Sequence, residues 1–171
     1  VLWVSHLRPP KRPELARELA RQLPQVRFTL VGGPMPGGQT YHDDVMAAAA
    51  RLPNVTMMGA VRYYDCAALF ERAKTFLNTS SIEGFPNTFL QAWIRGVPVV
   101  SFFDPDGLVH RLELGRIARS LDDMREAIRH LVRDVERQSL ADLGPFDLVI
   151  FTEVLEHLNF QPLPTVTKLR D

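Results

Sequence analysis

The residue types best suited to chemistry lie in the segment 78–91. This segment runs from the end of an apolar stretch into an amphipathic one, with Glu83 and Pro86 between the two. Proline suits a first helical turn, because the N–H group that it lacks has no partner there. The other free N–H groups of such a turn, with the helix dipole behind them, favour a phosphate or diphosphate. A carboxylate cannot bind that anion, so Glu83 is better suited to accept hydrogen bonds from sugar hydroxyls.

A second segment, 5–13, carries positive charge directly after another apolar run. It contains Arg8, Lys11 and Arg12. Lysine as a point charge and arginine as a planar fork both suit a diphosphate. Each segment also has a simpler interpretation: a capped helix with Glu83 in solvent for the first, and a solvated basic loop for the second. Two such segments at one edge of a sheet favour a binding site.

Short apolar runs that alternate with amphipathic stretches predict the framework that positions these segments. Strands are predicted at 1–5, 26–33, 55–61, 75–80, 97–103 and 115–118, and helices at 12–23, 43–52, 64–73, 87–95 and 120–134. Strands rich in Val, Ile and Leu, each followed by a helix, indicate an α/β fold. We expect a doubly wound, mostly parallel, Rossmann-like sheet with helices on both faces. Ligands of such sheets bind outside the carboxyl ends of the strands, where both segments lie.

Residues 1 to about 134 resemble the C-terminal, donor-binding domain of a retaining glycosyltransferase of family 4, with the two-Rossmann-domain architecture called GT-B. The stretches that carry the resemblance are VLWVSHLRPPKRPELA, FTLVGGP, NVTMMGAV, SIEGFPNTFLQAWIRGVPVVS and DPDGLV. The most specific motif of the family is a Glu, seven residues and a second Glu, with Gly-Phe-Pro-Asn after the first. In this chain Glu83 is followed by that tetrapeptide, and Gln91 stands at the second position.

The resemblance implies transfer of a sugar from a nucleotide diphosphate sugar, which is a substrate, with no cofactor and no metal. It assigns catalytic roles to Glu83, which would bind hydroxyls of the sugar, and to Lys11, which would neutralise the departing diphosphate. Fixed N–H dipoles and Lys11 would stabilise the charge that develops on the leaving group. His6 stands where the family has an arginine, and Arg8 is the candidate to replace it.

The resemblance also implies which residues bind the donor. Gln91 would contact the ribose, an edge near Val61 and Arg62 would border the nucleobase, and Gly32 and Gly33 would let the backbone approach the donor. The sugar and diphosphate would be held by the backbone of Gly84, Phe85, Pro86, Asn87 and Thr88.

The tripeptide Asp104-Pro105-Asp106 offers a competing interpretation. An Asp-x-Asp after a strand is the metal-binding signature of the other large glycosyltransferase fold class. Asp-Pro-Asp-Gly is also strong turn chemistry, and we expect a turn. His110, in the loop beyond, would either face the donor or lie in solvent, and Cys66 is predicted to be buried and inert.

Composition excludes several classes of protein. The chain has 171 residues with 20 basic and 20 acidic side chains, a balance that argues against nucleic-acid and anionic-membrane binders. Its single cysteine excludes a disulfide scaffold and a cysteine-based zinc site, and fits a reducing compartment, so we expect a cytoplasmic protein. No apolar run approaches the roughly 18–20 residues of a membrane span. The length fits one domain of a larger enzyme, and a strand beginning at Val1 suggests an acceptor-binding domain that precedes this chain.

The tail, 135–171, has a different character, with six acidic against three basic residues. The stretch from Gly144 to Leu158 resembles the fourth strand and following loop of class I S-adenosylmethionine-dependent methyltransferases, without their glycine-rich motif. We expect the tail to add a strand and a helix to the domain of residues 1–134, or to pair with another chain in a homo-oligomer. Two alternatives to a glycosyltransferase therefore remain, a methyltransferase fragment and a non-catalytic Rossmann-like interaction module.

Overall fold

The structure, a computed structural model, describes residues 1–134, and the predictions made for 135–171 lie outside the described residues. The apolar runs form strands β1 (Leu2–Val4), β2 (Phe28–Val31), β3 (Val55–Met57), β4 (Phe76–Asn78), β5 (Val99–Ser101) and β6 (Gly115–Ile117). The amphipathic stretches form helices α1 (Pro13–Gln22), α2 (Gln39–Ala49), α3 (Tyr63–Glu71), α4 (Asn87–Trp93), α5 (Leu108–Arg111) and α6 (Leu121–Asp134). Two short 3-10 turns complete the set, η1 (Pro9–Lys11) and η2 (Pro105–Gly107).

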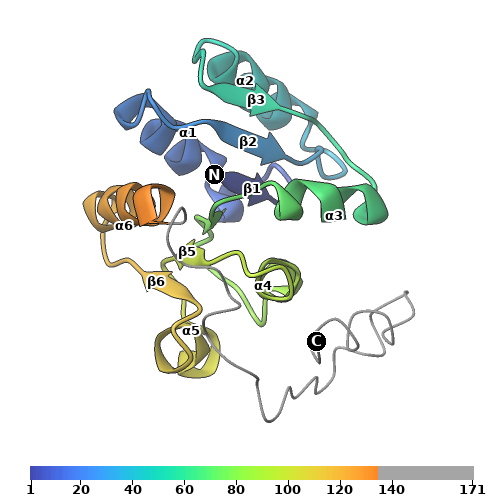
Figure 1. The fold of residues 1–171 in the computed structure, drawn as a ribbon. Helices are drawn as coiled ribbons and strands as arrows, with labels where there is room; N and C mark the ends of the chain where they lie inside the picture. The colour runs from blue at the N-terminus through green and yellow to red at the C-terminus, as the bar shows by residue number, and fades with distance from the viewer. Residues whose placement is uncertain (135–171) are drawn as a thin grey trace. The chain divides into compact units, whose positions relative to one another are not determined.

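The strands form one parallel sheet in the order β3-β2-β1-β4-β5-β6 (Figure 1). The chain moves outward from β1 to β3, returns to place β4 on the other side of β1, and moves outward again to β6. This reversal of direction between β1 and β4 opens a crevice at the carboxyl ends of the strands, where such folds bind ligands. The doubly wound Rossmann-like prediction is confirmed, and the described sheet is entirely parallel.

The pairing of β1 with β4, at this reversal, is the shortest in the sheet. The register of β1 against β4 contains one residue pair, Leu2 with Phe76, whereas each of the other four interfaces contains three. The two strands therefore diverge early, toward the carboxyl edge of the sheet.

Helices cover both faces of the sheet, because alternate residues of the buried strands point to opposite sides. Trp3 belongs to a core beneath α1, α2 and α6 that includes Leu19, Phe28 and Met124. Its neighbour Leu2 belongs to a second core beneath α3, α4 and α5, which includes Phe70, Phe76, Phe89, Val99 and Val109. The buried core residues include Trp3, Phe28, Phe70, Phe76 and Phe89.

The differences from the predicted elements lie at turns. Helix α2 begins at Gln39 rather than at 43, because the Gly38 N–H bonds to Met35 O at 2.8 Å and the helix starts from that turn. Pro86 stands just before α4 and not inside its first turn. The four-residue helix α5 was not predicted, and it follows two residues with positive φ, Asp106 (51°) and Gly107 (69°).

Helix α6 begins with a capping box built from Ser120 and Asp123. The Asp123 N–H donates to Ser120 Oγ at 3.1 Å, and the Ser120 N–H donates to Asp123 Oδ2 at 3.0 Å. The hydrogen bond from the Arg119 N–H, and after it those with Ser120, hold the pKa of the Asp123 carboxyl below its usual range. The helix then buries Met124 and Ile128 against α1 and the sheet.

We expect Ser120→Ala to lower the free energy of unfolding by about 1 kcal/mol, because the Asp123 N–H loses its acceptor. The measurement is the urea midpoint at an unchanged m-value. Ser120→Thr keeps the hydroxyl and is the matched control. A threonine variant that loses as much stability as the alanine variant would show that the hydroxyl is not what stabilises the helix start.

Candidate functional site

A pocket of about 570 Å³ opens at the carboxyl ends of β1, β2 and β4. Its floor and walls come from the ends of these strands, from the loops that follow β1, β3 and β4, and from the start of α4. Eleven of the residues predicted for the site line it: Arg8, Lys11, Gly32, Gly33, Val61, Glu83, Phe85, Pro86, Asn87, Thr88 and Gln91. Gly84 lies in the same loop as Glu83, but neither Gly84 nor Arg62 is among the lining residues. The two segments that the sequence singles out therefore meet in one pocket.

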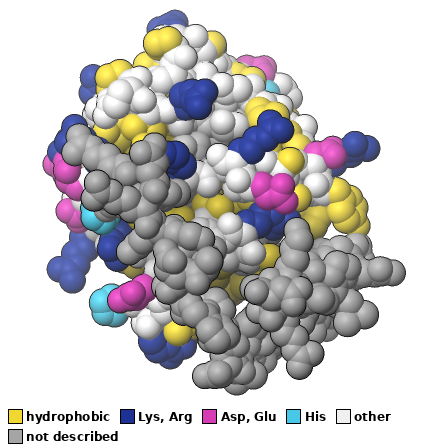
Figure 2. All heavy atoms as spheres, viewed as in Figure 1, with side chains coloured by type: hydrophobic (Ala, Val, Ile, Leu, Met, Phe, Trp, Pro, Cys, Tyr) yellow, Lys and Arg dark blue, Asp and Glu magenta, His cyan; other side chains and the backbone are white. Residues whose placement is uncertain are grey.

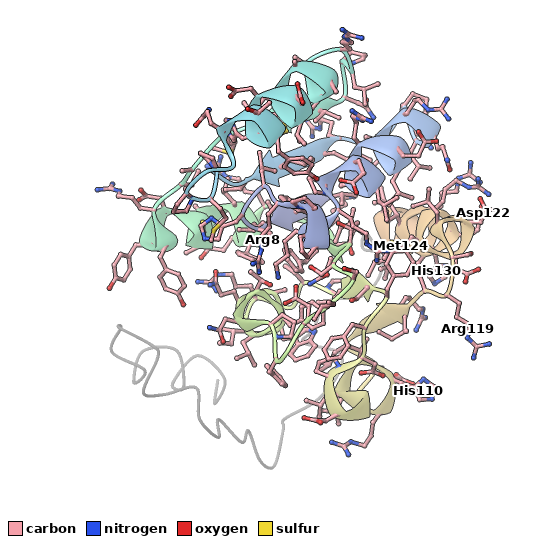
Figure 3. All side chains as sticks on the ribbon, turned by 180° about the vertical axis from the view of Figure 1, so that it is seen from behind. Arg8, His110, Arg119, Asp122, Met124 and His130 are labelled. Carbon is pink, nitrogen blue, oxygen red and sulfur yellow. The ribbon has the colours of Figure 1, made fainter. Side chains whose placement is uncertain are left out.

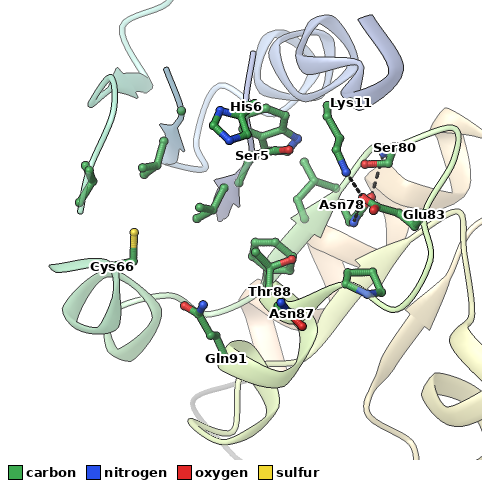
Figure 4. A pocket seen from close by; sticks show the side chains of 18 of the residues that line it. Ser5, His6, Lys11, Cys66, Asn78, Ser80, Glu83, Asn87, Thr88 and Gln91 are labelled. Atoms are coloured by element: carbon green, nitrogen blue, oxygen red, sulfur yellow. Dashed lines mark hydrogen bonds and ion pairs between the residues drawn. The ribbon is translucent and has the colours of Figure 1, made fainter. Parts of the chain in front are cut away.

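The closest contact in the pocket joins the two predicted catalytic residues. Lys11 Nζ lies 2.6 Å from Glu83 Oε1, and both side chains are nearly buried, with exposed fractions of 13% and 12% (Figure 4). Asn78 Nδ2 donates to the same carboxylate oxygen at 3.2 Å. The sequence predicts separate partners for the two residues, diphosphate for Lys11 and sugar for Glu83. In the structure they are each other's partner.

The electrostatics of Glu83 follow from this contact. Burial on its own would raise the pKa of the carboxyl, but hydrogen bonds from Lys11, Ser80 and Asn78 outweigh burial and lower the pKa below its ordinary value. Glu83 is therefore ionised at neutral pH. An ionised carboxylate only accepts hydrogen bonds, which suits it to the hydroxyls of a polyol.

The loop that carries Glu83 is fixed by buried polar residues at the end of β4. The Ser80 N–H donates to Asn78 Oδ1 at 2.8 Å, and Trp3 Nε1 donates to Thr79 Oγ1 at 2.9 Å. The side chains of Asn78, Thr79 and Ser80 are almost completely buried. Burying consecutive polar side chains costs free energy unless each forms hydrogen bonds. Here those hydrogen bonds also fix the loop that carries Glu83.

Two glycines allow backbone segments to approach closely at the rim of the pocket. A Cβ atom on Gly32 would lie 1.8 Å from Ser5 O, and one on Gly33 would lie 3.0 Å from Ala60 Cβ. We expected both glycines to make room for the donor. The contacts show that Gly32 is required by the neighbouring β1 backbone, and that Gly33 borders the loop after β3.

On the side of the pocket away from Lys11 lie Cys66 of α3 and Gln91 of α4, as Figure 4 shows. Burial, and secondarily the charge of Asp65, raises the pKa of the Cys66 thiol, which agrees with the prediction of a buried, unreactive cysteine. Phe85 stands at the rim with its ring edge-on to Trp93 at a centroid distance of 6.3 Å.

Residues 1–134 match the protein family described as "Glycosyl transferases group 1". This match spans most of the chain and all of the described residues. The chain belongs to the group 1 glycosyl transferases.

Curated proteins similar to this group 1 glycosyl transferase are themselves glycosyltransferases. The D-inositol 3-phosphate glycosyltransferase of Mycobacterium leprae is 30% identical over 104 residues, 59% of this chain and 24% of that protein. The chain therefore spans about a quarter of the length of the curated relatives that it matches.

Solved structures share the fold. HepE of Anabaena, determined in complex with UDP and glucose, has a TM-score of 0.63 and 23% identity over 79% of this chain and 39% of its own. Sucrose-phosphate synthase from Thermosynechococcus elongatus has a TM-score of 0.66 and 23% identity over 78% of this chain and 36% of its own. With the family match, these neighbours support a GT-B C-terminal domain for residues 1–134.

Two candidates from the sequence lie outside the pocket of this group 1 domain. Asp104 accepts hydrogen bonds from the N–H groups of Val109, at 2.8 Å, and His110, at 3.3 Å, so the Asp-Pro-Asp sequence forms the turn that starts α5. No cluster of three or more His, Cys, Asp or Glu side chains in residues 1–134 is arranged to hold a metal ion. His110 is exposed on α5, away from Arg8 at the pocket (Figure 3), so of the two alternatives the structure favours a histidine in solvent.

Arg12 also lies outside the pocket. The sequence offers it, with Arg8, as a partner for a diphosphate, but its guanidinium donates to two backbone carbonyls, as described below. Arg8 lines the pocket and is exposed, so it is the arginine of this segment that can reach a ligand.

Several residues that line the pocket of this group 1 domain received no role of their own from the sequence. Ser5, Asn78 and Ser80 lie within the two predicted segments, whereas Ala60 and Tyr63 lie outside them. A usable signal was present for the polar ones, because Ser5 follows the apolar run of β1 and Asn78 and Ser80 end that of β4. Polar residues at the carboxyl ends of buried parallel strands mark the ligand edge. The position of Tyr63, at the start of α3, carries no such signal.

The distribution of charged side chains on the surface agrees with the equal numbers of basic and acidic residues in the sequence. On the face in Figure 2, basic and acidic side chains are scattered among uncharged ones over the part of the chain that the structure describes. In the same range, no helix combines the length and the apolar character that crossing a membrane requires.

Proposed function

We propose that this chain is the donor-binding half of a retaining glycosyltransferase, which binds a nucleotide diphosphate sugar and presents it to an acceptor held by another domain of the protein. The observation that carries the proposal is the Lys11–Glu83 pair, almost buried in a pocket at the reversal point of a Rossmann-like sheet. A pocket that places a cation and an ionised carboxylate on one wall is suited to a ligand with both an anionic and a polyhydroxyl part.

The chemistry assigns the two charges to different parts of the donor. Transfer breaks the bond between the sugar C1 and the diphosphate oxygen, and the electron pair leaves with the diphosphate. Lys11 and Arg8 stabilise the negative charge that grows there, together with N–H groups of the first turn of α4. The N–H groups of α4 are fixed by the helix and need no rearrangement as the charge develops.

Glu83 binds sugar hydroxyls in this proposal, and Gln91 contacts the ribose. Gln91 lies across the pocket from Glu83, separated by the start of α4 (Figure 4). A donor that runs from Glu83 to Gln91 therefore crosses Asn87 and Thr88 with its diphosphate. Because Lys11 is already paired with Glu83, binding of the donor replaces part of that ion pair with contacts to diphosphate on one side and hydroxyls on the other.

The test is titration of the 171-residue chain with UDP, GDP and ADP and with sugars attached to each, by calorimetry or tryptophan fluorescence. UDP compounds come first, because HepE was solved with UDP and glucose and the pneumococcal O-GlcNAc transferase GtfA with UDP and GlcNAc. Both tryptophans of the chain can report binding: Trp3 lines the pocket, and Trp93 contacts Phe85 at its rim. S-adenosylmethionine is added as a further ligand, to test the methyltransferase alternative.

Replacing Glu83 with glutamine distinguishes the contribution of the sugar to binding from that of the nucleotide diphosphate. We expect Glu83→Gln to weaken binding of the nucleotide sugar by about tenfold, the loss of one charge-assisted hydrogen bond. Binding of the nucleotide diphosphate alone should be unchanged or tighter, because Lys11 loses its competing partner. Glu18→Gln, which removes the same charge from an exposed pair on α1, is the control. Equal effects on the two ligands, or no binding by the parent chain, would contradict the proposal.

A further inference from the structure

The segments that carry Lys11 and Glu83 are far apart in the sequence and are joined by hydrogen bonds outside the ion pair. Thr79 Oγ1 donates to Lys11 O at 2.7 Å, and the Ser81 N–H donates to Pro10 O at 2.9 Å. These bonds connect the turn η1 to the loop between β4 and α4. They leave the carbonyl groups of Thr79 and Ser80 to be satisfied by another donor.

Arg12 supplies that donor. Its Nε donates to Thr79 O at 2.6 Å, and its Nη2 donates to Ser80 O at 3.1 Å. The guanidinium also lies over the ring of Phe102, 4.8 Å from the centroid, in the loop after β5. One side chain therefore fixes two consecutive carbonyls and stacks on an aromatic ring, which the planar fork of arginine can do and the single ammonium group of lysine cannot.

The backbone of Arg12 is in the left-handed region, with φ 47° and ψ 54°, where it ends η1 and begins α1. A residue with a Cβ atom is strained in this region, and such strain persists only where the surroundings enforce the conformation. At Arg12 the surroundings are the three contacts of its own side chain, together with the hydrogen bonds of its backbone N–H to Pro9 O and of its carbonyl to the Leu15 N–H. Left-handed residues of this kind concentrate at functional sites.

We propose that Arg12 is a positioning residue, which holds the Lys11 turn against the loop of Glu83 so that the ammonium and the carboxylate meet in the pocket. Its effect on donor binding rests on the function proposed above. Its effect on the geometry of the Lys11–Glu83 pair does not, and the two effects are measured separately.

The experiment compares Arg12→Gly, Arg12→Lys and Glu113→Gly in the full 171-residue chain. Glycine at position 12 relieves the backbone strain while removing the guanidinium. Glu113 has a similar positive φ of 53° and lies outside the pocket, so Glu113→Gly controls for relief of strain alone. Carbon-detected NMR follows the titration of the Glu83 carboxyl, whose pKa the contact with Lys11 helps to lower. Fluorescence titration with UDP measures ligand binding.

We expect Arg12→Gly to raise the pKa of Glu83 toward its ordinary value and to weaken UDP binding about tenfold, while Glu113→Gly changes neither. Arg12→Lys should give a smaller change in the same direction, and it carries the test by itself if Arg12→Gly does not fold. If the pKa of Glu83 in the folded variants equals that of the parent chain, Arg12 does not position the pair. If that pKa rises but the parent chain binds no nucleotide, the positioning role stands and the proposed function fails.

Discussion

Replacing Lys11 with methionine is expected to weaken binding of UDP, and of any nucleotide sugar, by about ten- to a hundredfold. Methionine keeps the length of the side chain and removes the charge that meets the diphosphate. Loss of a charged hydrogen-bond partner costs about 1.5–3 kcal/mol, which corresponds to that range of affinity. Unlike Glu83→Gln, this substitution should affect the diphosphate and the nucleotide sugar alike. Calorimetric titration of both ligands measures the two effects.

The same variant tests the electrostatics of the unliganded pocket. In the parent chain the pKa of Glu83 lies below its ordinary value of 4.5, so the carboxylate contributes stability above that pH and loses it as the pH falls through the folded-state value. Without Lys11, burial is opposed only by Asn78 and Ser80, and the pKa of Glu83 rises. The free energy of unfolding of Lys11→Met should therefore fall less steeply on acidification than that of the parent.

The control for this variant is Lys74→Met, which removes the same charge from an exposed lysine outside the pocket. Its UDP affinity should match that of the parent, because Lys74 does not line the pocket. Parallel stability curves for the parent and Lys11→Met between pH 3 and 7 would show that the pair does not control Glu83. Unchanged UDP affinity would show that Lys11 does not meet the diphosphate.

Replacing Gly32 with alanine is expected to destabilise the fold by about 3 kcal/mol or more, the range reached when a new atom clashes with backbone that cannot move aside. The added Cβ would lie 1.8 Å from Ser5 O, at the carboxyl ends of two paired strands. Because the Ser5 N–H also bonds to Val31 O at 3.0 Å, the two backbones cannot separate without losing the end of their ladder. Urea denaturation measures the loss, and a strongly destabilised variant will be found mostly unfolded.

Gly84→Ala provides the comparison within the same site. A Cβ atom on Gly84 meets no heavy atom within 4 Å, and its backbone does not require glycine. The variant should therefore retain the parent's stability to within about 0.5 kcal/mol, as surface substitutions usually do. Similar losses for the two alanine variants would mean that the close approach at Gly32 is not what limits side chains there.

The framework was predictable because its strands and helices have strong patterns. The run VPVVSFF predicts a buried strand, of which the structure forms Val99–Ser101, and an alternation of strands and helices indicates a parallel sheet whose carboxyl edge holds the site. What patterns could not supply were the ends of the elements. Helix α2 begins at Gln39 because of a single turn at Gly38, and α5 exists because Asp104 accepts two N–H groups from its first turn. Such local hydrogen bonds have no periodic signature.

The site was predictable in its members but not in their contacts. Segment 78–91 and segment 5–13 could be placed at one edge by topology alone, and the resemblance then assigned roles to Glu83 and Lys11. That these two residues bind each other, and that Arg12 turns away from the pocket, depends on the left-handed backbone of Arg12. Arginine gives no sign of that conformation in a sequence, because glycine and asparagine are the residues that usually mark it.

The short ladder between β1 and β4 has a consequence for how the domain opens. Strands β1 to β3 and strands β4 to β6 each form a three-stranded unit with longer registers inside it, so a partial unfolding event should begin by parting the two units. Near the carboxyl edge the two units are connected by hydrogen bonds of Arg12 and Thr79 and by the Lys11–Glu83 ion pair. A donor that contacts both units would stabilise their association further. Binding of the donor and association of the two units are therefore thermodynamically linked.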